Sequence, residues 1–196
     1  KHRAIDARCR MPPDSCAGLA FSKPDSPTKE IRSAMSFGSL SGPAIEAINR
    51  GGAMAGALHN TGAEPARFHW IRKAYQRVEG IDVPEAFVTH EDDVPGGEMP
   101  GTEGRWTTQR FADPTDVRHD MHVNIVTFQP GGAIPFPETH VMEHGLFVLE
   151  GKAVYRLNRD WVEVGPGDFM WLRAFCPQAC YAGGPGRFRY LLYKRS

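Results

Sequence analysis

The sequence lacks an excess of either charge and lacks any long apolar run. Lysine plus arginine total 23, as do aspartate plus glutamate, so no overall field recruits nucleic acid or an anionic membrane. No segment approaches the roughly 18 consecutive apolar residues that a membrane span requires. The basic start Lys1-His2-Arg3 is not followed by the apolar core of a signal peptide. We therefore expect a cytoplasmic protein that acts on a small molecule and binds neither nucleic acid nor membrane.

Cysteine is also scarce, with Cys9 and Cys16 near the start of the chain and Cys176 and Cys180 near its end. Four cysteines at this spacing fit reduced thiols better than a disulfide framework. The Cys176-x3-Cys180 pair leaves open a thiolate metal site, although two buried thiols are the commoner outcome for such a pair.

The chain has 196 residues, a length that suits one domain with an appendage. Its amino-acid composition changes along the sequence. Residues 1 to about 30 are rich in proline, serine and charge, which predicts an extended or disordered leader. Ser41 and Pro43 are typical of a helix start, and Ile45 and Ile48 would share one face of that short helix. The expected organisation is an N-terminal extension that is not an independent domain (1–66), a linker (67–84) and one domain (85–196).

The region after residue 85 contains short β-like runs separated by turn formers such as Pro130-Gly131-Gly132 and Gly165-Pro166-Gly167. Many short strands at this spacing predict an all-β sandwich or barrel. The predicted strands are 86–89, 105–111, 122–128, 145–149, 153–157, 161–164, 168–172 and 188–193.

Four donor side chains recur at spacings that suit one metal site, and they are Glu138, His140, His144 and Gln178. Glu138 and His140 are two residues apart, so they face one side of a strand, and His144 joins them if a bend keeps the same side inward. Gln178 would complete the set with its amide oxygen. Donors of this kind without thiolate favour Mn²⁺ or Fe²⁺ over structural zinc. The competing interpretation is that one His-x3-His pair arises by chance and is solvated.

This donor pattern resembles the two motifs of the cupin superfamily, which implies a single double-stranded β-helix, or jelly-roll barrel. A closer resemblance, over about residues 67–194, is to the (S)-ureidoglycine aminohydrolase family. The motifs that carry it include Tyr155-Arg156-Leu157, Gly167-Asp168-Phe169-Met170-Trp171, Cys176-Pro177-Gln178 and Arg189-Tyr190-Leu191-Leu192-Tyr193-Lys194.

The resemblance implies an enzyme that hydrolyses (S)-ureidoglycine to (S)-ureidoglycolate and ammonia in allantoin and purine catabolism. It implies a Mn²⁺ cofactor, with Fe²⁺ or another divalent ion as the alternative, on the four donors named above. Lys194 would bind the substrate carboxylate, Tyr155 and Tyr190 would orient the substrate, and Glu138 would shuttle a proton.

The family places a second cupin before the linker, where this chain has a different segment. Residues 23–62 resemble part of the FMN-binding domain of glutamate synthase, including Met35-Ser36-Phe37-Gly38 and His59-Asn60-Thr61-Gly62. About forty residues cannot enclose a flavin. Two alternatives stay open, namely a catalytically impaired cupin left by loss of the N-terminal cupin, and an amino-group oxidoreductase fragment. We also expect a homo-oligomer formed through cupin–cupin contact.

Overall fold

The computed structural model describes residues 4–7, 65, 69, 71 and 74–195 of the chain. The chain divides into two units, and the unit made of Lys1–Cys16 and Tyr75–Ser196 contains every strand described below. The helix expected near Pro43 and the glutamate-synthase-like segment lie outside the described residues. Among the residues described, no helix is long and apolar enough to cross a membrane.

The described elements are eleven strands and one short 3-10 turn. They are β1 (Ala4–Ala7), η3 (Glu91–Asp93), β2 (Gly96–Glu98), β3 (Trp106–Arg110), β4 (Met121–Phe128), β5 (Ala133–Glu138), β6 (His144–Glu150), β7 (Ala153–Leu157), β8 (Asp160–Val164), β9 (Phe169–Leu172), β10 (Gln178–Tyr181) and β11 (Phe188–Arg195).

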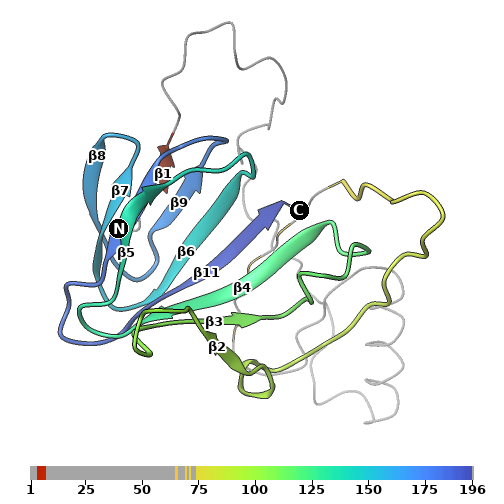
Figure 1. Cartoon of the computed structure of the whole chain (residues 1–196), viewed down its shortest axis with the longest axis horizontal. Helices are drawn as coiled ribbons and strands as arrows, with labels where there is room; N and C mark the ends of the chain where they lie inside the picture. Colours follow the sequence, from red (N-terminus) through yellow and green to blue (C-terminus); the bar gives the residue numbers. More distant parts are fainter. Residues whose placement is uncertain (1–3, 8–64, 66–68, 70, 72–73, 196) are drawn as a thin grey trace, which may run out of the picture. The chain divides into compact units, whose positions relative to one another are not determined.

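The strands form two sheets, as Figure 1 shows. The first has the order β1-β9-β6-β11-β4-β3-β2, and the second has the order β5-β10-β7-β8. Apart from the parallel pair β1–β9, all pairings are antiparallel. The prediction of an all-β fold is confirmed.

The core consists of side chains that alternate inward from both sheets. In β7, Ala153, Tyr155 and Leu157 are buried, whereas Val154 between them is exposed. This period of two is the sequence signal of a strand with one buried face. Phe128, Leu146, Val148, Val164, Met170, Leu172 and Phe188 are also fully buried in this cluster. Each such burial stabilises the fold by about 1.5–3 kcal/mol.

Three predictions about local structure were wrong. Residues 86–89 form no strand, because β2 already pairs with the outer edge of β3, and Val88 is fully exposed. Strands β5 and β10 were not predicted, since Pro135 and Pro137 interrupt the apolar pattern of β5. The leader was expected to be extended or disordered, and no strand pairing was predicted for it, whereas Ala4–Ala7 pairs with β9.

Close contacts at two glycines of the fold leave no room for a side chain. Gly145 lies opposite Tyr193 on β11, and a Cβ there would come within 2.4 Å of the Tyr193 ring. Gly151 has a φ of 75°, and a Cβ would lie 2.1 Å from the carbonyl oxygen of Arg187. These glycines let β6 lie close against its neighbours, so that His144 is placed by a strand that cannot easily shift.

Candidate metal centre and substrate pocket

A cavity of about 330 Å³ opens between the two sheets, and all seven site residues predicted from the sequence line it. These residues are Glu138, His140, His144, Tyr155, Gln178, Tyr190 and Lys194. They come from five strands and one loop, so the fold gathers groups that are up to fifty-six residues apart in sequence, from Glu138 to Lys194.

The donors approach one another from different elements. Glu138 is the last residue of β5 and pairs in register with Gln178, the first residue of β10. His144 begins β6 in the other sheet. His140 was predicted to share a strand face with Glu138, but β5 ends at Glu138 and His140 lies in the following loop. The loop, and not strand alternation, turns its imidazole towards the cavity.

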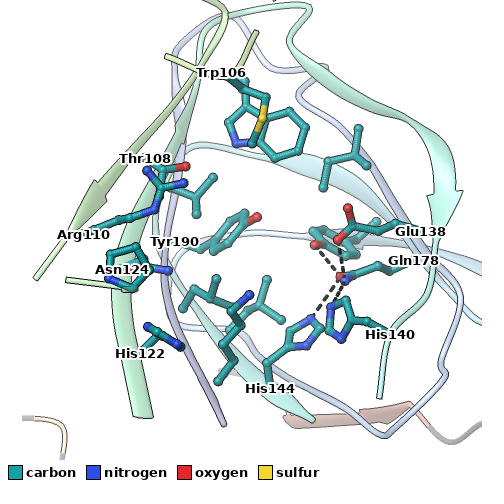
Figure 2. A pocket seen from close by; sticks show the side chains of 18 residues that line it. Trp106, Thr108, Arg110, His122, Asn124, Glu138, His140, His144, Gln178 and Tyr190 are labelled. Carbon is teal, nitrogen blue, oxygen red and sulfur yellow. Dashed lines mark hydrogen bonds between the residues drawn. The ribbon is translucent and has the colours of Figure 1, made fainter. Parts of the chain in front are cut away.

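The Gln178 amide connects the other three donors, as the dashed lines in Figure 2 partly show. Its Nε2 donates to Glu138 Oε1 at 2.8 Å and lies 3.4 Å from His140 Nε2. Its Oε1 lies 3.1 Å from His144 Nε2. The two imidazole rings have centroids 4.8 Å apart. One carboxylate, two imidazoles and one amide therefore converge on one small volume.

His144 is held as a neutral imidazole. Burial lowers its pKa to about 4, and the nearby His140 acts in the same direction. Its Nε2 faces Gln178 Oε1 and its Nδ1 lies 3.4 Å from the Met142 carbonyl oxygen. A neutral ring has one N–H for these two acceptors. The shorter contact places the proton on Nε2, which donates to Gln178 Oε1. With the proton on Nδ1, towards Met142, Nε2 would instead present a lone pair to an ion, which is the usual arrangement of a metal-binding histidine.

The residues present fit a divalent ion, and two further observations bear on that fit. His140 Nδ1 is buried without a hydrogen-bond partner in the described structure. Within residues 4–7 and 74–195, no three His, Cys, Asp or Glu side chains are grouped closely enough to hold an ion by themselves. The Gln178 amide lies between Glu138 and His140. A metal site here would use Gln178 as a fourth donor, through the amide oxygen that faces His144.

Tyr155 and Tyr190 lie beside the donor set on β7 and β11. The Tyr155 hydroxyl donates to Gln178 Oε1 at 3.0 Å, and the two tyrosine rings meet edge-on with centroids 6.3 Å apart. Burial raises the pKa of both phenols well above the usual value, so both hydroxyls stay protonated. Tyr155 is thus placed to orient the Gln178 oxygen.

Lys194 lies in the middle of a row of polar residues that crosses the first sheet. It pairs in register with His144 on β6 and with His122 on β4. Burial, followed by the charge of Lys194, lowers the pKa of His122. The Lys194 side chain lines the cavity and therefore supplies a positive charge next to the donor set.

The sequence interpretation missed the polar wall that β3 and β4 contribute. Arg110, Thr108, His122 and Asn124 line the cavity opposite Glu138 and Gln178, as Figure 2 shows. The signal was present in the strand 121–128, where His122 and Asn124 occupy the same alternate positions as the buried residues Val126 and Phe128. A polar residue at an inward position of a central strand indicates a cavity or a ligand.

The possibility of a thiolate site at Cys176 and Cys180 is not supported. Both cysteines are buried and form no disulfide among the described residues, and burial raises the pKa of the Cys180 thiol. Neither belongs to a metal-binding group among the described residues. They are therefore the two buried thiols of the alternative interpretation.

The sequence and the structure are similar to those of cupin proteins. Residues 124–193 match the Cupin domain family model. A protein of Oryza sativa subsp. japonica named probable (S)-ureidoglycine aminohydrolase is 38% identical over 124 residues, which are 63% of this chain and 39% of that protein. The (S)-ureidoglycine aminohydrolase of Arabidopsis thaliana is 43% identical over 81 residues, which are 41% of this chain and 27% of that enzyme.

A solved structure of a Pseudomonas aeruginosa protein, described as glyoxylate-induced, is similar with a TM-score of 0.66 and 74% identity. The similarity covers 70% of this chain and 51% of that one. This chain thus spans well under half the length of the two plant relatives and about half of the bacterial protein.

Proposed function

Residues 124–193 form a cupin domain, and from that premise we propose that the chain is a metal-dependent hydrolase of (S)-ureidoglycine. The reaction breaks the bond between the central carbon and the amino nitrogen, adds water to that carbon, and yields (S)-ureidoglycolate and ammonia. The similarity to proteins named (S)-ureidoglycine aminohydrolase supports this substrate. The convergence of Glu138, His140, His144 and Gln178 is the observation that carries the proposal.

The four donors would hold Mn²⁺, or Fe²⁺ or another divalent ion. Such an ion supplies Lewis-acid stabilisation of charge at the reacting carbon and lowers the pKa of a water. Tyr155 holds the Gln178 oxygen in place through its 3.0 Å hydrogen bond. A buried, oriented amide costs no reorganisation when the site is used.

The remaining predicted residues bind substrate and move a proton. Lys194, which lies next to His144 across the β6–β11 pair, attracts the substrate carboxylate. Glu138 accepts a proton from the attacking water and returns it to the leaving amine, which departs as ammonia. Tyr190, whose hydroxyl remains protonated, donates to the substrate from the floor of the cavity.

The proposal is tested by measuring ammonia release from freshly generated (S)-ureidoglycine by the Mn²⁺-loaded chain. Lys194→Ala should raise KM at least tenfold and leave bound metal unchanged, because Lys194 contacts substrate and not the ion. An exposed control, Lys152→Ala, removes a lysine that forms a surface ion pair with Glu163 and should change neither quantity. Absence of turnover in metal-loaded wild type, or equal KM in both variants, would refute the assignment.

A second candidate function is a cupin that binds metal and small molecules without turnover. It stays open because the similarity to the proteins named (S)-ureidoglycine aminohydrolase extends over 124 and 81 residues of this chain. The same assay separates the two candidates, since this one predicts bound metal with no ammonia release. The glutamate-synthase-like oxidoreductase concerns residues outside the described part, and a bound flavin in the purified protein would be needed to support it.

The location, assembly and partners of the protein are further proposals. We infer a cytoplasmic homo-oligomer that contacts no nucleic acid and no membrane, and in which cupin domains of two chains pair. The balance of 23 basic and 23 acidic residues supports the absence of nucleic acid. Light scattering of the purified chain measures the oligomeric state.

A further inference from the structure

The wall formed by β3 and β4 contains polar groups that the proposed reaction has not used. Arg110 and Asn124 are direct partners in the β3–β4 pairing, and both line the cavity. Thr108 lies two residues before Arg110 on β3. Its side chain is buried and also lines the cavity. We call Arg110, Asn124 and Thr108 the β3–β4 wall.

Asn124 is the most informative member of this wall. It is only 6% exposed, and its Oδ1 is buried without a hydrogen-bond partner. An unsatisfied buried acceptor costs about 1–3 kcal/mol, so a fold keeps one where something else satisfies it. Arg110 is exposed at the cavity and has no carboxylate partner among the described residues. The wall therefore offers an acceptor beside a guanidinium donor.

The position of the wall relative to Lys194 follows from the strand register. Asn124 faces Leu192 on β11, so Lys194 is its diagonal neighbour. Diagonal neighbours across antiparallel strands have backbones about 7–8 Å apart, with side chains able to meet. Lys194 in turn faces His144 of the donor set. Across the sheet, the strand order β6-β11-β4-β3 therefore places four side chains in sequence, namely His144 of the donor set, Lys194, Asn124 and Arg110.

We propose that the β3–β4 wall is a subsite for the ureido group of the substrate. The Asn124 Oδ1 accepts a hydrogen bond from the terminal amino group of the ureido moiety, and Arg110 donates to its carbonyl oxygen. In a ureido acid, one carbon and one nitrogen separate the carboxylate from the ureido carbon, which suits neighbouring anchors at Lys194 and the β3–β4 wall. The inference rests on the proposed function, because it assigns the part of that substrate that the donor set and Lys194 leave free.

The test uses two stable ligands of equal size, N-carbamoylglycine and N-acetylglycine, which differ by an amino group in place of a methyl group. Isothermal titration calorimetry on the full Mn²⁺-loaded chain should give about tenfold tighter binding of N-carbamoylglycine, because N-acetylglycine leaves the Asn124 acceptor unpaired. Asn124→Leu should abolish this preference and bind N-acetylglycine no more weakly than wild type.

Arg110→Met keeps the proposal testable if Asn124→Leu fails to fold, since Arg110 is exposed. This variant should weaken both ligands about tenfold and keep the preference, because both ligands have the carbonyl oxygen. No preference in wild type, or an undiminished preference in Asn124→Leu, would overturn the subsite.

Ammonia release is measured on the same preparations. Turnover without ligand preference refutes the subsite alone, whereas preference without turnover refutes the proposed catalysis and leaves the subsite standing.

Discussion

The hydrogen bond from Tyr155 to Gln178 permits a sharp prediction about metal affinity. Tyr155→Phe removes the hydroxyl that lies 3.0 Å from Gln178 Oε1 and leaves His144 Nε2 as the remaining contact of that oxygen. Loss of a group that orients a metal ligand typically weakens metal binding by about 10- to 100-fold. That range corresponds to about 1.4–2.8 kcal/mol of binding free energy. The unfolding free energy of the metal-free protein should fall by only about 1 kcal/mol, the typical worth of one hydrogen bond.

The assay is a Mn²⁺ titration by calorimetry, with chemical denaturation measured on the same chelated samples. Tyr181→Phe is the matched control, because it removes the same atom from a ring on β10 that is 52% exposed. The control should bind Mn²⁺ like wild type. Wild-type affinity in Tyr155→Phe would refute the positioning role of the hydroxyl. A loss of several kcal/mol in stability would show that the variant acts through unfolding instead.

Three further predictions concern stability and reactivity. Gly145→Ala should lower the unfolding free energy by about 1–3 kcal/mol in denaturant titration, because the new Cβ would overlap the Tyr193 ring; an unchanged midpoint would contradict the close contact. The metal-free protein should lose about 3 kcal/mol as pH falls from 6.5 to 4, because His144 has a pKa of about 4 when folded and 6.5 when unfolded, so the unfolded state takes up the proton first. His144→Gln should flatten that part of the stability profile, and an equally steep loss in this variant would assign the effect to other groups. In a variant without the two N-terminal cysteines, a thiol reagent at pH 8 should label only the unfolded protein, since the remaining thiols are buried and burial raises the pKa of Cys180; rapid labelling of the native protein would contradict this.

Much of the fold was predictable because strand alternation is local. The run 153–157 has apolar residues at every second position, and it forms β7 with that face buried. Strand β5 was missed because its two prolines weaken the apolar signal. Proline is tolerated there because β5 is the edge strand of its sheet and pairs only with β10 among the described strands. Residues 86–89 have a strand-like composition but form no strand. Whether a segment finds a pairing partner depends on the rest of the fold, so the local sequence could not show it.

Some residues of the candidate site could be predicted from the sequence and others could not. Glu138, His140 and His144 lie close in sequence, so their spacing alone indicated a shared site. Gln178 lies forty residues from Glu138, so local spacing could not show that the two are neighbours, and the β5–β10 register now pairs them. Asn124 and Arg110 were missed because no motif contains them, and their approach to the cavity depends on which strands become neighbours.

The most direct test of the metal centre is the metal content of the purified chain after Mn²⁺ loading and removal of free ion. The account predicts about one Mn²⁺ per wild-type chain and a large loss in both His144→Ala and Gln178→Ala, with each variant shown to be folded by circular dichroism. Full Mn²⁺ content in a folded Gln178→Ala protein would contradict it, because the account makes the Gln178 oxygen one of the four donors.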